Sequence, residues 1–295
     1  MHINELEISE NLVQSLLDKQ CSRWAKLPLS RVSSNGTVHT LYRLGKEFII
    51  RLPRIEWVEG TVNDTIEKEF KWIPLLSKLV DVSLGEPVFK GEADENYPWS
   101  WTIATWNEGD NPDFEKENEY NVLAEDLADF LNSLHTIKLS GGPWSRRGVP
   151  LQAQDVDTRK AIAELKAEID VRAVTELWNQ LLETPQWNQD PLWVHGDLLP
   201  GNILIRDNRL TAIIDFSDLG IGDPACDLII AWSLFNHSSR QVFRNYLQYI
   251  DEDTWKRGKG WALSIALIML PYYKYSNPFM ASLAERMIAN ILNDK

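Results

Sequence analysis

The residues with the clearest chemical potential are Asp197, Asn202 and Asp215, which follow one another at short spacing in the sequence. Two carboxylates and an amide are hard oxygen donors, and Mg²⁺ favours such donors together with substrate phosphate and water. Phosphoryl transfer needs metal ligands of this kind and one further carboxylate that orients the acceptor hydroxyl and takes its proton. If the three side chains meet, they could support that reaction.

A predicted β-hairpin would bring two of these side chains together. The short apolar strands Ile203–Ile205 and Leu210–Ile214 flank Asp207–Arg209, which has the composition of a tight turn. Strand ends on either side of such a turn lie side by side in an antiparallel pair. We therefore expect Asn202, just before the first strand, to lie close to Asp215, just after the second.

Asp197 precedes the hairpin on the loop Gly196–Gly201. Glycine at both ends of this loop and Pro200 inside it specify an extended, narrowly defined course. The loop should therefore carry Asp197 into the same small volume as the other two polar groups. The spacing Asp-x-x-x-x-Asn followed by Asp-Phe is the layout that protein kinases use for phosphoryl transfer.

Three segments of the chain, His195–Leu204, Ile213–Phe216 and Gly222–Leu228, together resemble the aminoglycoside phosphotransferase family. That family includes aminoglycoside and macrolide kinases and kinases of the choline and homoserine type. The resemblance is densest over residues 193–235 and weaker from about residue 30 to about residue 275. It implies a bilobal, protein-kinase-like α+β fold with a small β-rich N-lobe and a larger, mainly helical C-lobe.

The resemblance also implies roles for the residues of the central motif. It makes Asp197 the catalytic base and makes Asn202 and Asp215 the Mg²⁺ ligands. We interpret His195 as a residue that orders the loop rather than as an acid or base. The chain has His-Gly-Asp where protein kinases have His-Arg-Asp.

Two further aspartates, Asp223 and Asp227, follow the Asp-Pro-x-x-Asp pattern of the same family. Aspartate is favoured at helix N-termini, so capping and loop anchoring are the structural interpretation of both. For Asp227, contact with the acceptor substrate and a structural role both stay open.

A kinase also needs a loop that covers the nucleotide phosphates. The resemblance places this loop at Ser34, Asn35 and Gly36, within residues 33–38, although the segment has only one glycine. It places the purine against the backbone from Thr105 to Asn107.

The third requirement is a cation for the phosphates and a carboxylate that holds the cation. Arg51 stands at the end of a predicted strand where the family has lysine. Arginine keeps the charge but differs in geometry, and an ordinary surface arginine is the alternative. We expect Glu69, in preference to Glu67, to be the partner of Arg51.

Hydrophobic periodicity predicts the elements that would position these residues. In the N-terminal part they are a helix over 5–19, strands over 29–33, 37–44 and 47–52, a helix over 62–80, and strands over 88–90 and 99–106. In the C-terminal part they are a helix over 120–134, one or two helices within 158–183, and helices over 241–250 and 255–292, interrupted near Pro271 and Pro278. The polar stretch Asn107–Pro112 is the expected connector. The lobes are therefore predicted at 1–106 and 107–295.

Composition excludes several other classes of protein. The net charge of −13 and the lack of a Lys/Arg cluster argue against a nucleic-acid-binding protein. The two cysteines have no metal-ligand spacing, which suits a reducing cytosol. The first twenty residues lack the apolar segment of a signal peptide, and the longest apolar run, Trp261–Leu270, is too short to span a bilayer. We therefore expect a cytoplasmic protein with no membrane partner.

The sequence predicts a Mg²⁺-dependent enzyme that moves the γ-phosphoryl group of ATP or GTP to a hydroxyl of a small molecule. An aminoglycoside-type antibiotic is the favoured acceptor, because the acidic chain suits a cationic ligand, and antibiotic resistance would be the consequence. The alternatives are a macrolide kinase, a metabolic kinase of the choline or homoserine type, and a nucleotide-binding pseudokinase. The Asp-Pro-x-x-Asp segment and the lack of an Ala-Pro-Glu motif argue against a protein kinase.

Overall fold

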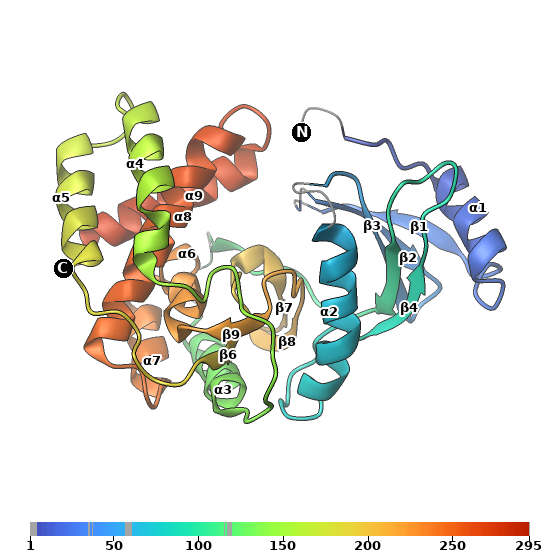
Figure 1. The fold of residues 1–295 in the computed structure, drawn as a ribbon, viewed down its shortest axis with the longest axis horizontal. Coiled ribbons are helices and arrows are strands. Elements are labelled where there is room, and N and C mark those ends of the chain that lie inside the picture. The colour runs from blue at the N-terminus through green and yellow to red at the C-terminus, as the bar shows by residue number, and fades with distance from the viewer. Residues whose placement is uncertain are drawn as a thin grey trace. The chain divides into compact units, whose positions relative to one another are not determined.

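The computed structural model describes residues 5–34, 36, 38–56, 61–114, 116 and 120–294. The chain divides into two compact units, Met1–Glu108 and Gly109–Lys295. The boundary predicted from the sequence lies after Trp106. Figure 1 labels most of the helices and strands of the two units.

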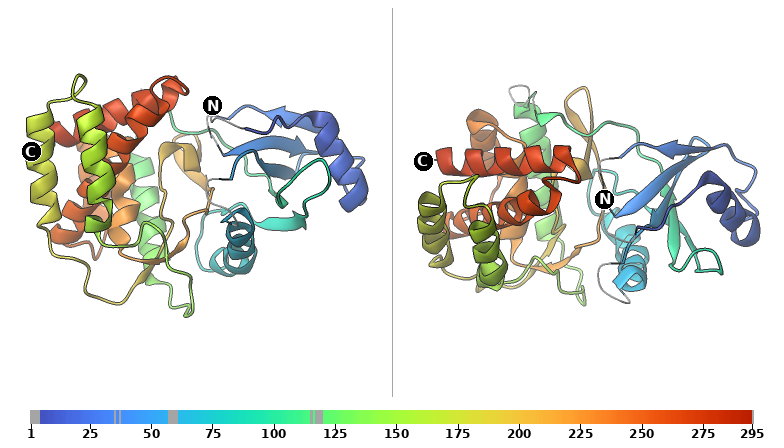
Figure 2. Two further views of the ribbon diagram at one scale, coloured as in Figure 1. Left: turned by 45° about the horizontal axis from the view of Figure 1, so that its top comes forward. Right: turned by 90° about the horizontal axis from the view of Figure 1, so that it is seen from above.

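The first unit is built on a five-stranded antiparallel sheet in the order β1-β2-β3-β5-β4. Its strands are β1 (Leu29–Val32), β2 (His39–Leu44), β3 (Phe48–Pro53), β4 (Pro87–Gly91) and β5 (Trp101–Thr105). Each lies where the sequence predicted a strand. Gly45, with a φ of +62°, makes the tight turn between β2 and β3. Figure 2 shows this sheet from two further directions.

Helix α1 (Glu10–Gln20) covers one face of the sheet through its apolar stripe. Its buried residues Val13, Leu16 and Leu17 belong to one hydrophobic cluster with residues of the central strands. The helix begins at Glu10, not at residue 5 as predicted. Ser9, whose own backbone is extended, caps the helix by accepting a hydrogen bond from the Leu12 amide.

Helix α2 (Thr61–Leu76) follows β3 and carries Glu69 among its buried residues. The prediction extended this helix to residue 80, four residues beyond its observed end. The helix has five buried positions along one stripe, and these account for the helical periodicity of its sequence.

The second unit is mainly helical and contains two small two-stranded sheets (Figure 1). The helices are α3 (Asn121–Thr136), α4 (Asp155–Glu164), α5 (Val171–Leu182), α6 (Ile230–Ser233), α7 (His237–Tyr246), α8 (Glu252–Tyr273) and α9 (Pro278–Asn293). The sheets pair β6 (Leu192–Val194) with β9 (Gly220–Gly222) and β7 (Ile203–Arg206) with β8 (Arg209–Ile213). Of the helices that the structure describes, none is long and apolar enough to cross a membrane.

The predicted interruption near Pro271 is confirmed to within two residues, because α8 continues through this proline and ends at Tyr273. Pro271 lies in the last turn of α8, where its missing N–H removes a single hydrogen bond from a helix that is otherwise largely buried. Pro278 does mark a boundary, as the first residue of α9. Asn277 caps that helix through the Met280 amide, and proline is well suited to the first helical position.

Candidate active site

The β7–β8 hairpin places Asn202 and Asp215 at the same end of two paired strands. Ile203 is paired with Ile213, and the Ile214 amide donates a hydrogen bond to the Asn202 carbonyl at 2.9 Å. At the other end the turn residues Asp207 and Asn208 both have positive φ, as a tight two-residue hairpin turn requires. Asn202 and Asp215 are thereby brought side by side, as the sequence predicted.

The loop before the hairpin joins Asp197 to Asn202. The Asn202 side-chain amide donates to the Asp197 carbonyl at 2.8 Å and to its Oδ2 at 3.1 Å. The side chain of Asn111 donates to the carbonyls of Gly201 and Ile203 at 2.9 and 2.8 Å. The loop is therefore fixed by side chains at both of its ends. Asp197 and Asn202 lie in contact, as predicted.

His195 is fully buried and connects this loop to the strand that precedes Asp215. Its Nδ1 accepts a hydrogen bond from the Asp197 amide at 3.1 Å, and its Nε2 donates to the Ile214 carbonyl at 3.1 Å. The imidazole ring also packs on Phe216, with ring centroids 4.7 Å apart. These contacts agree with the loop-ordering role that the sequence suggested.

Asp227 anchors the same loop, which favours the structural one of the two roles that the sequence left open for it. Its side chain is fully buried. Oδ1 accepts from the Gly196 amide at 2.7 Å, and Oδ2 accepts from the His195 amide and from His135 Nε2, both at 3.0 Å. A carboxylate that is enclosed and hydrogen-bonded in this way is a structural anchor and does not face a ligand.

The substitution Asp227→Asn should lower the free energy of unfolding by about 1–3 kcal/mol, because it leaves a buried backbone N–H without a good acceptor. Denaturant unfolding of the variant measures this loss. The exposed Asp190 provides a matched control, and Asp190→Asn should leave the unfolding curve unchanged. Equal stability of the Asp227 variant and the unaltered protein would contradict the anchoring role.

Asp223 has the capping role that the sequence suggested. Its side chain accepts from the Ala225 amide at 3.0 Å at the start of the short helix Pro224–Ile229. It also forms a buried ion pair with Arg257, whose Nε lies 2.7 Å from Oδ2. The negative charge of Asp223 is therefore balanced by Arg257 within the second unit.

Arg147 belongs to the site and was not found from the sequence. One guanidinium nitrogen contacts Asp197 Oδ1 and donates to the Gly196 carbonyl at 3.2 Å, and Nε lies 3.7 Å from Asp218. Burial alone would lower the pKa of Arg147, but the carboxylates of Asp197 and Asp218 outweigh it and raise that pKa above its ordinary value. No spacing rule connects residues this far apart in the sequence, so no signal there could have identified Arg147.

In the first unit, Arg51 pairs with the carboxylate that the sequence assigned to it. Arg51 lies on β3, and its guanidinium is 2.8 Å from Glu69 Oε2 on α2. The side chains are 16% and 2% exposed, so Arg51 is not an ordinary surface arginine. Glu67 instead contacts Lys90, which supports the preference for Glu69.

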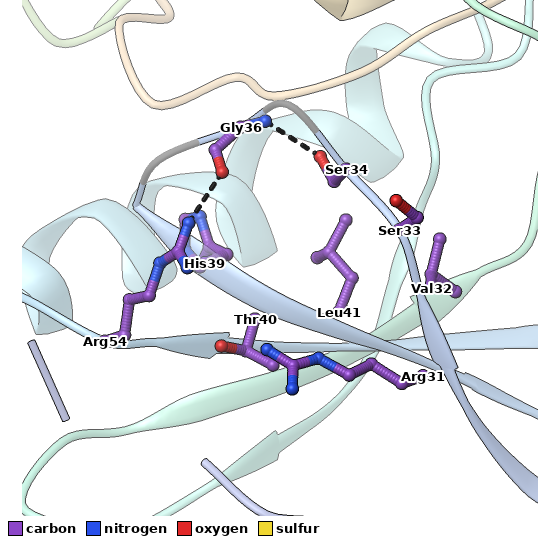
Figure 3. A pocket seen from close by; sticks show the side chains of 9 residues that line it. All are labelled: Arg31, Val32, Ser33, Ser34, Gly36, His39, Thr40, Leu41 and Arg54. Carbon is purple, nitrogen blue, oxygen red and sulfur yellow. Dashed lines mark hydrogen bonds between the residues drawn. The ribbon is translucent and has the colours of Figure 1, made fainter. Parts of the chain in front are cut away.

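The predicted nucleotide-covering loop is described at Ser34 and Gly36, and Asn35 lies outside the described residues. The Gly36 amide donates to Ser34 Oγ at 3.0 Å, and Arg54 donates to the Gly36 carbonyl at 2.7 Å (Figure 3). These residues line a pocket at the tip of the β1–β2 hairpin together with Arg31 and His39. Cationic and small polar groups at this tip are suited to an anionic ligand.

The segment predicted to contact a purine is partly committed to other contacts. The amide of Thr105 donates to the Glu86 carbonyl at 2.9 Å, and the Asn107 side chain accepts from Ser83. The Trp106 amide likewise donates to the Glu47 carbonyl. The backbone amides of Thr105 and Trp106 therefore already have partners within the first unit.

Comparison with known sequences connects this geometry to a family. Residues 28–261 match the phosphotransferase enzyme family. The chain belongs to this family. The match includes β3 with Arg51 in the first unit and the whole segment from Asp197 to Asp227 in the second.

Curated members with similar sequences match over part of their length. An uncharacterized protein of Bacillus subtilis (strain 168), YcbJ, is 28% identical over 145 residues, which are 46% of this chain and 44% of that protein. An aminoglycoside 3'-phosphotransferase of Escherichia coli is 27% identical over 120 residues, which are 38% and 43% of the two chains. The matched stretch thus spans less than half the length of these relatives.

Solved structures resemble the phosphotransferase over almost its whole length. The GDP and kanamycin complex of an APH(2") enzyme has a TM-score of 0.74 at 17% identity, covering 95% of this chain and 97% of the other. The macrolide 2'-phosphotransferase MphH from Brachybacterium faecium has a TM-score of 0.63 at 20% identity, covering 96% and 99%. At these identities the likeness shows the fold, and it confirms the predicted α+β, kinase-like architecture.

The donor groups of this phosphotransferase fit Mg²⁺. The side-chain nitrogen of Asn202 donates to Asp197, so its oxygen is the atom that could bind a metal. Asp215 supplies a carboxylate beside it. The described part of the chain has no group of three or more His, Cys, Asp or Glu that could enclose a metal by themselves. Two protein oxygens completed by phosphate and water form the type of site that Mg²⁺ favours.

Proposed function

We propose that this phosphotransferase moves the γ-phosphoryl group of ATP or GTP to a hydroxyl group of a small molecule. The observation that carries the proposal is the joining of Asp197 to Asn202 on a loop that Asp227 and His195 hold in place. This arrangement gives one fixed carboxylate beside a pair of oxygen donors. Phosphoryl transfer needs such positioning and little covalent chemistry from the protein.

Each residue has a separate task in the proposed reaction. Asp197 orients the acceptor hydroxyl and takes its proton as the oxygen attacks the γ-phosphorus atom. The bond from this phosphorus to the β,γ-bridging oxygen breaks, and the nucleoside diphosphate leaves. Asn202 and Asp215 would hold Mg²⁺, which supplies neutralisation of the phosphate charge when it is bound. Arg51, held by Glu69, would bind the phosphates of the nucleotide.

The nucleotide donor is supported by the family and by the GDP in a structurally similar complex. A cytoplasmic location follows as part of the proposal, because nucleoside triphosphates are used there. Both cysteines are free and buried, which is compatible with that compartment.

The proposed acceptor is an aminoglycoside-type antibiotic, with a macrolide as the alternative, and antibiotic resistance would follow from either. Similar proteins named for both acceptor classes support this proposal. The acidic residues of the motif themselves give little support to a cationic acceptor. Asp218 is paired with Arg146 and Arg147, and Asp223 is paired with Arg257. The attraction for a cation therefore comes from the net charge of −13 as a whole.

A screen of acceptors tests the proposal. The purified protein is incubated with Mg²⁺ and either ATP or GTP in the presence of aminoglycosides, macrolides, choline, homoserine or sugars. We expect acceptor-dependent nucleotide turnover with at least one aminoglycoside, and mass spectrometry should detect one added phosphoryl group on it. Nucleotide binding without turnover on any acceptor would identify a pseudokinase and overturn the proposal.

The substitution Arg51→Lys should weaken nucleotide binding about tenfold, which corresponds to the loss of about one charged hydrogen bond. Lysine keeps the charge but cannot contact Glu69 and a phosphate through two ends of one planar group. Titration calorimetry with the nucleotide and Mg²⁺ measures the change. Arg172→Lys, at an exposed arginine of α5 that pairs with Glu176, is the control. Unchanged affinity in the Arg51 variant would assign Arg51 a role confined to its ion pair with Glu69.

A further inference from the structure

The segment Pro143–Gly148 is packed directly against the backbone that follows Asp215. Ser145 is buried, and its hydroxyl donates to the Asp218 carbonyl at 2.8 Å. The Ser145 amide donates to the Ile221 carbonyl at 3.1 Å. A Cβ atom on Gly220 would lie 2.3 Å from the Ser145 nitrogen, so the two backbones can approach this closely only at a glycine. The position of this segment is therefore set independently of its charged side chains.

The two arginines of this segment have different partners. Arg146 forms an ion pair with Asp218 at 2.7 Å, and its side chain is 69% exposed. Arg147 is 27% exposed and contacts both Asp197 Oδ1 and the Gly196 carbonyl. Only Arg147 of this pair reaches the proposed base.

The Asp197 carboxylate is consequently held from two sides. Arg147 binds Oδ1, and the Asn202 amide donates to Oδ2 at 3.1 Å. Each carboxylate oxygen can accept two hydrogen bonds, so both oxygens keep a direction in which an acceptor hydroxyl can approach. Two donors at opposite ends of the group also prevent rotation of the carboxylate about its Cβ–Cγ bond.

We propose that Arg147 is a positioning residue for the catalytic base: it fixes the Asp197 carboxylate in the orientation that receives the acceptor hydroxyl. This inference rests on the proposed function, since it presumes that Asp197 is the base. Arg147 also compensates the charge of a carboxylate that must approach anionic phosphates. Misplacement of a reacting group by about 1 Å can cost about 10²-fold in rate. The loss of Arg147 should therefore appear in kcat and leave nucleotide binding intact.

The test compares Arg147→Gln, Arg147→Lys and Arg147→Ala with the control Arg146→Gln. For each protein, kcat, the KM of the acceptor, the Kd of the nucleotide and the unfolding midpoint in urea are measured. We expect Arg147→Gln to lower kcat about 10- to 100-fold. The nucleotide Kd of this variant should stay within about twofold of the Kd of the unaltered protein. The guanidinium contacts the proposed base and not the proposed nucleotide-binding residues, and Ser145 keeps the segment in place without it. Arg146→Gln should lower kcat less than about threefold, as exposed ion pairs contribute little.

Rescue of the lost activity distinguishes a positioning role of Arg147 from a role in stability alone. Lysine should restore part of kcat, and added guanidinium ion should restore part of the activity of Arg147→Ala without changing the unfolding midpoint. An unchanged kcat in Arg147→Gln would overturn the inference while the proposed function stands. A fall in kcat that follows a fall in stability, with no rescue, would also overturn it. Absence of transfer by the unaltered protein would overturn the proposed function, and the inference with it.

Discussion

Replacing Asp197 by alanine should lower the rate of phosphoryl transfer by about 10²- to 10⁴-fold, the usual contribution of a general base. The structure gives the reason, because Asp197 is joined to Asn202 and lies on a loop that is fixed at both ends. Two other aspartates of the motif, Asp223 and Asp227, cannot take over the role at that position. Asp223 and Asp227 are buried and already engaged with Arg257, His135 and backbone amides.

Two controls make the Asp197 result specific. Nucleotide binding should persist in Asp197→Ala, since the proposed phosphate and metal contacts come from other residues. Asp197→Asn keeps the size of the side chain and the contact with Arg147, yet it should be nearly as inactive because an amide cannot take the proton. Near-normal turnover in either variant would remove Asp197 as the base.

Replacing Asp215 should abolish the Mg²⁺ dependence of nucleotide binding. The carboxylate lies beside Asn202 at the open end of the β7–β8 hairpin and is the one charged group of the proposed metal pair. Binding of ATP or GTP to Asp215→Asn, measured by calorimetry with and without Mg²⁺, should be equally weak in both conditions. Retention of the full Mg²⁺ effect would contradict the assignment.

The choice of asparagine for that experiment follows from the backbone. Asp215 has a φ of +61°, a conformation that asparagine adopts more readily than most residues. Alanine would add backbone strain of about 1–2 kcal/mol. A loss of metal binding could then not be distinguished from a loss of stability. Asp207→Asn is the matched control, because Asp207 lies on the same hairpin, also has positive φ and is exposed. It should keep the Mg²⁺ dependence.

Local patterns made much of the candidate site predictable. The hairpin that brings Asn202 to Asp215 is encoded by two short apolar strands and a turn of Asp and Asn, and the register follows from them. Arg51 and Glu69 were also paired correctly, because the resemblance to the family placed both residues. The contact between Asn202 and Asp215 depends on neighbours close in the chain.

Features that depend on burial, or on contacts between segments far apart in the sequence, could not be predicted from local patterns. The anchoring role of Asp227 is visible only when its carboxylate is seen enclosed by His135 and the loop amides. Arg147 reaches Asp197 through tertiary packing of the segment around Ser145.

The most direct test of the account follows the γ-phosphoryl group itself. ATP or GTP labelled at the γ-phosphate is mixed with Mg²⁺, kanamycin or another acceptor from the screen, and either the unaltered protein or Asp197→Asn. The account predicts that the unaltered protein places the label on a hydroxyl of the acceptor and that the variant loses nearly all of this transfer. Label found only in inorganic phosphate, in equal amounts with both proteins, would contradict it.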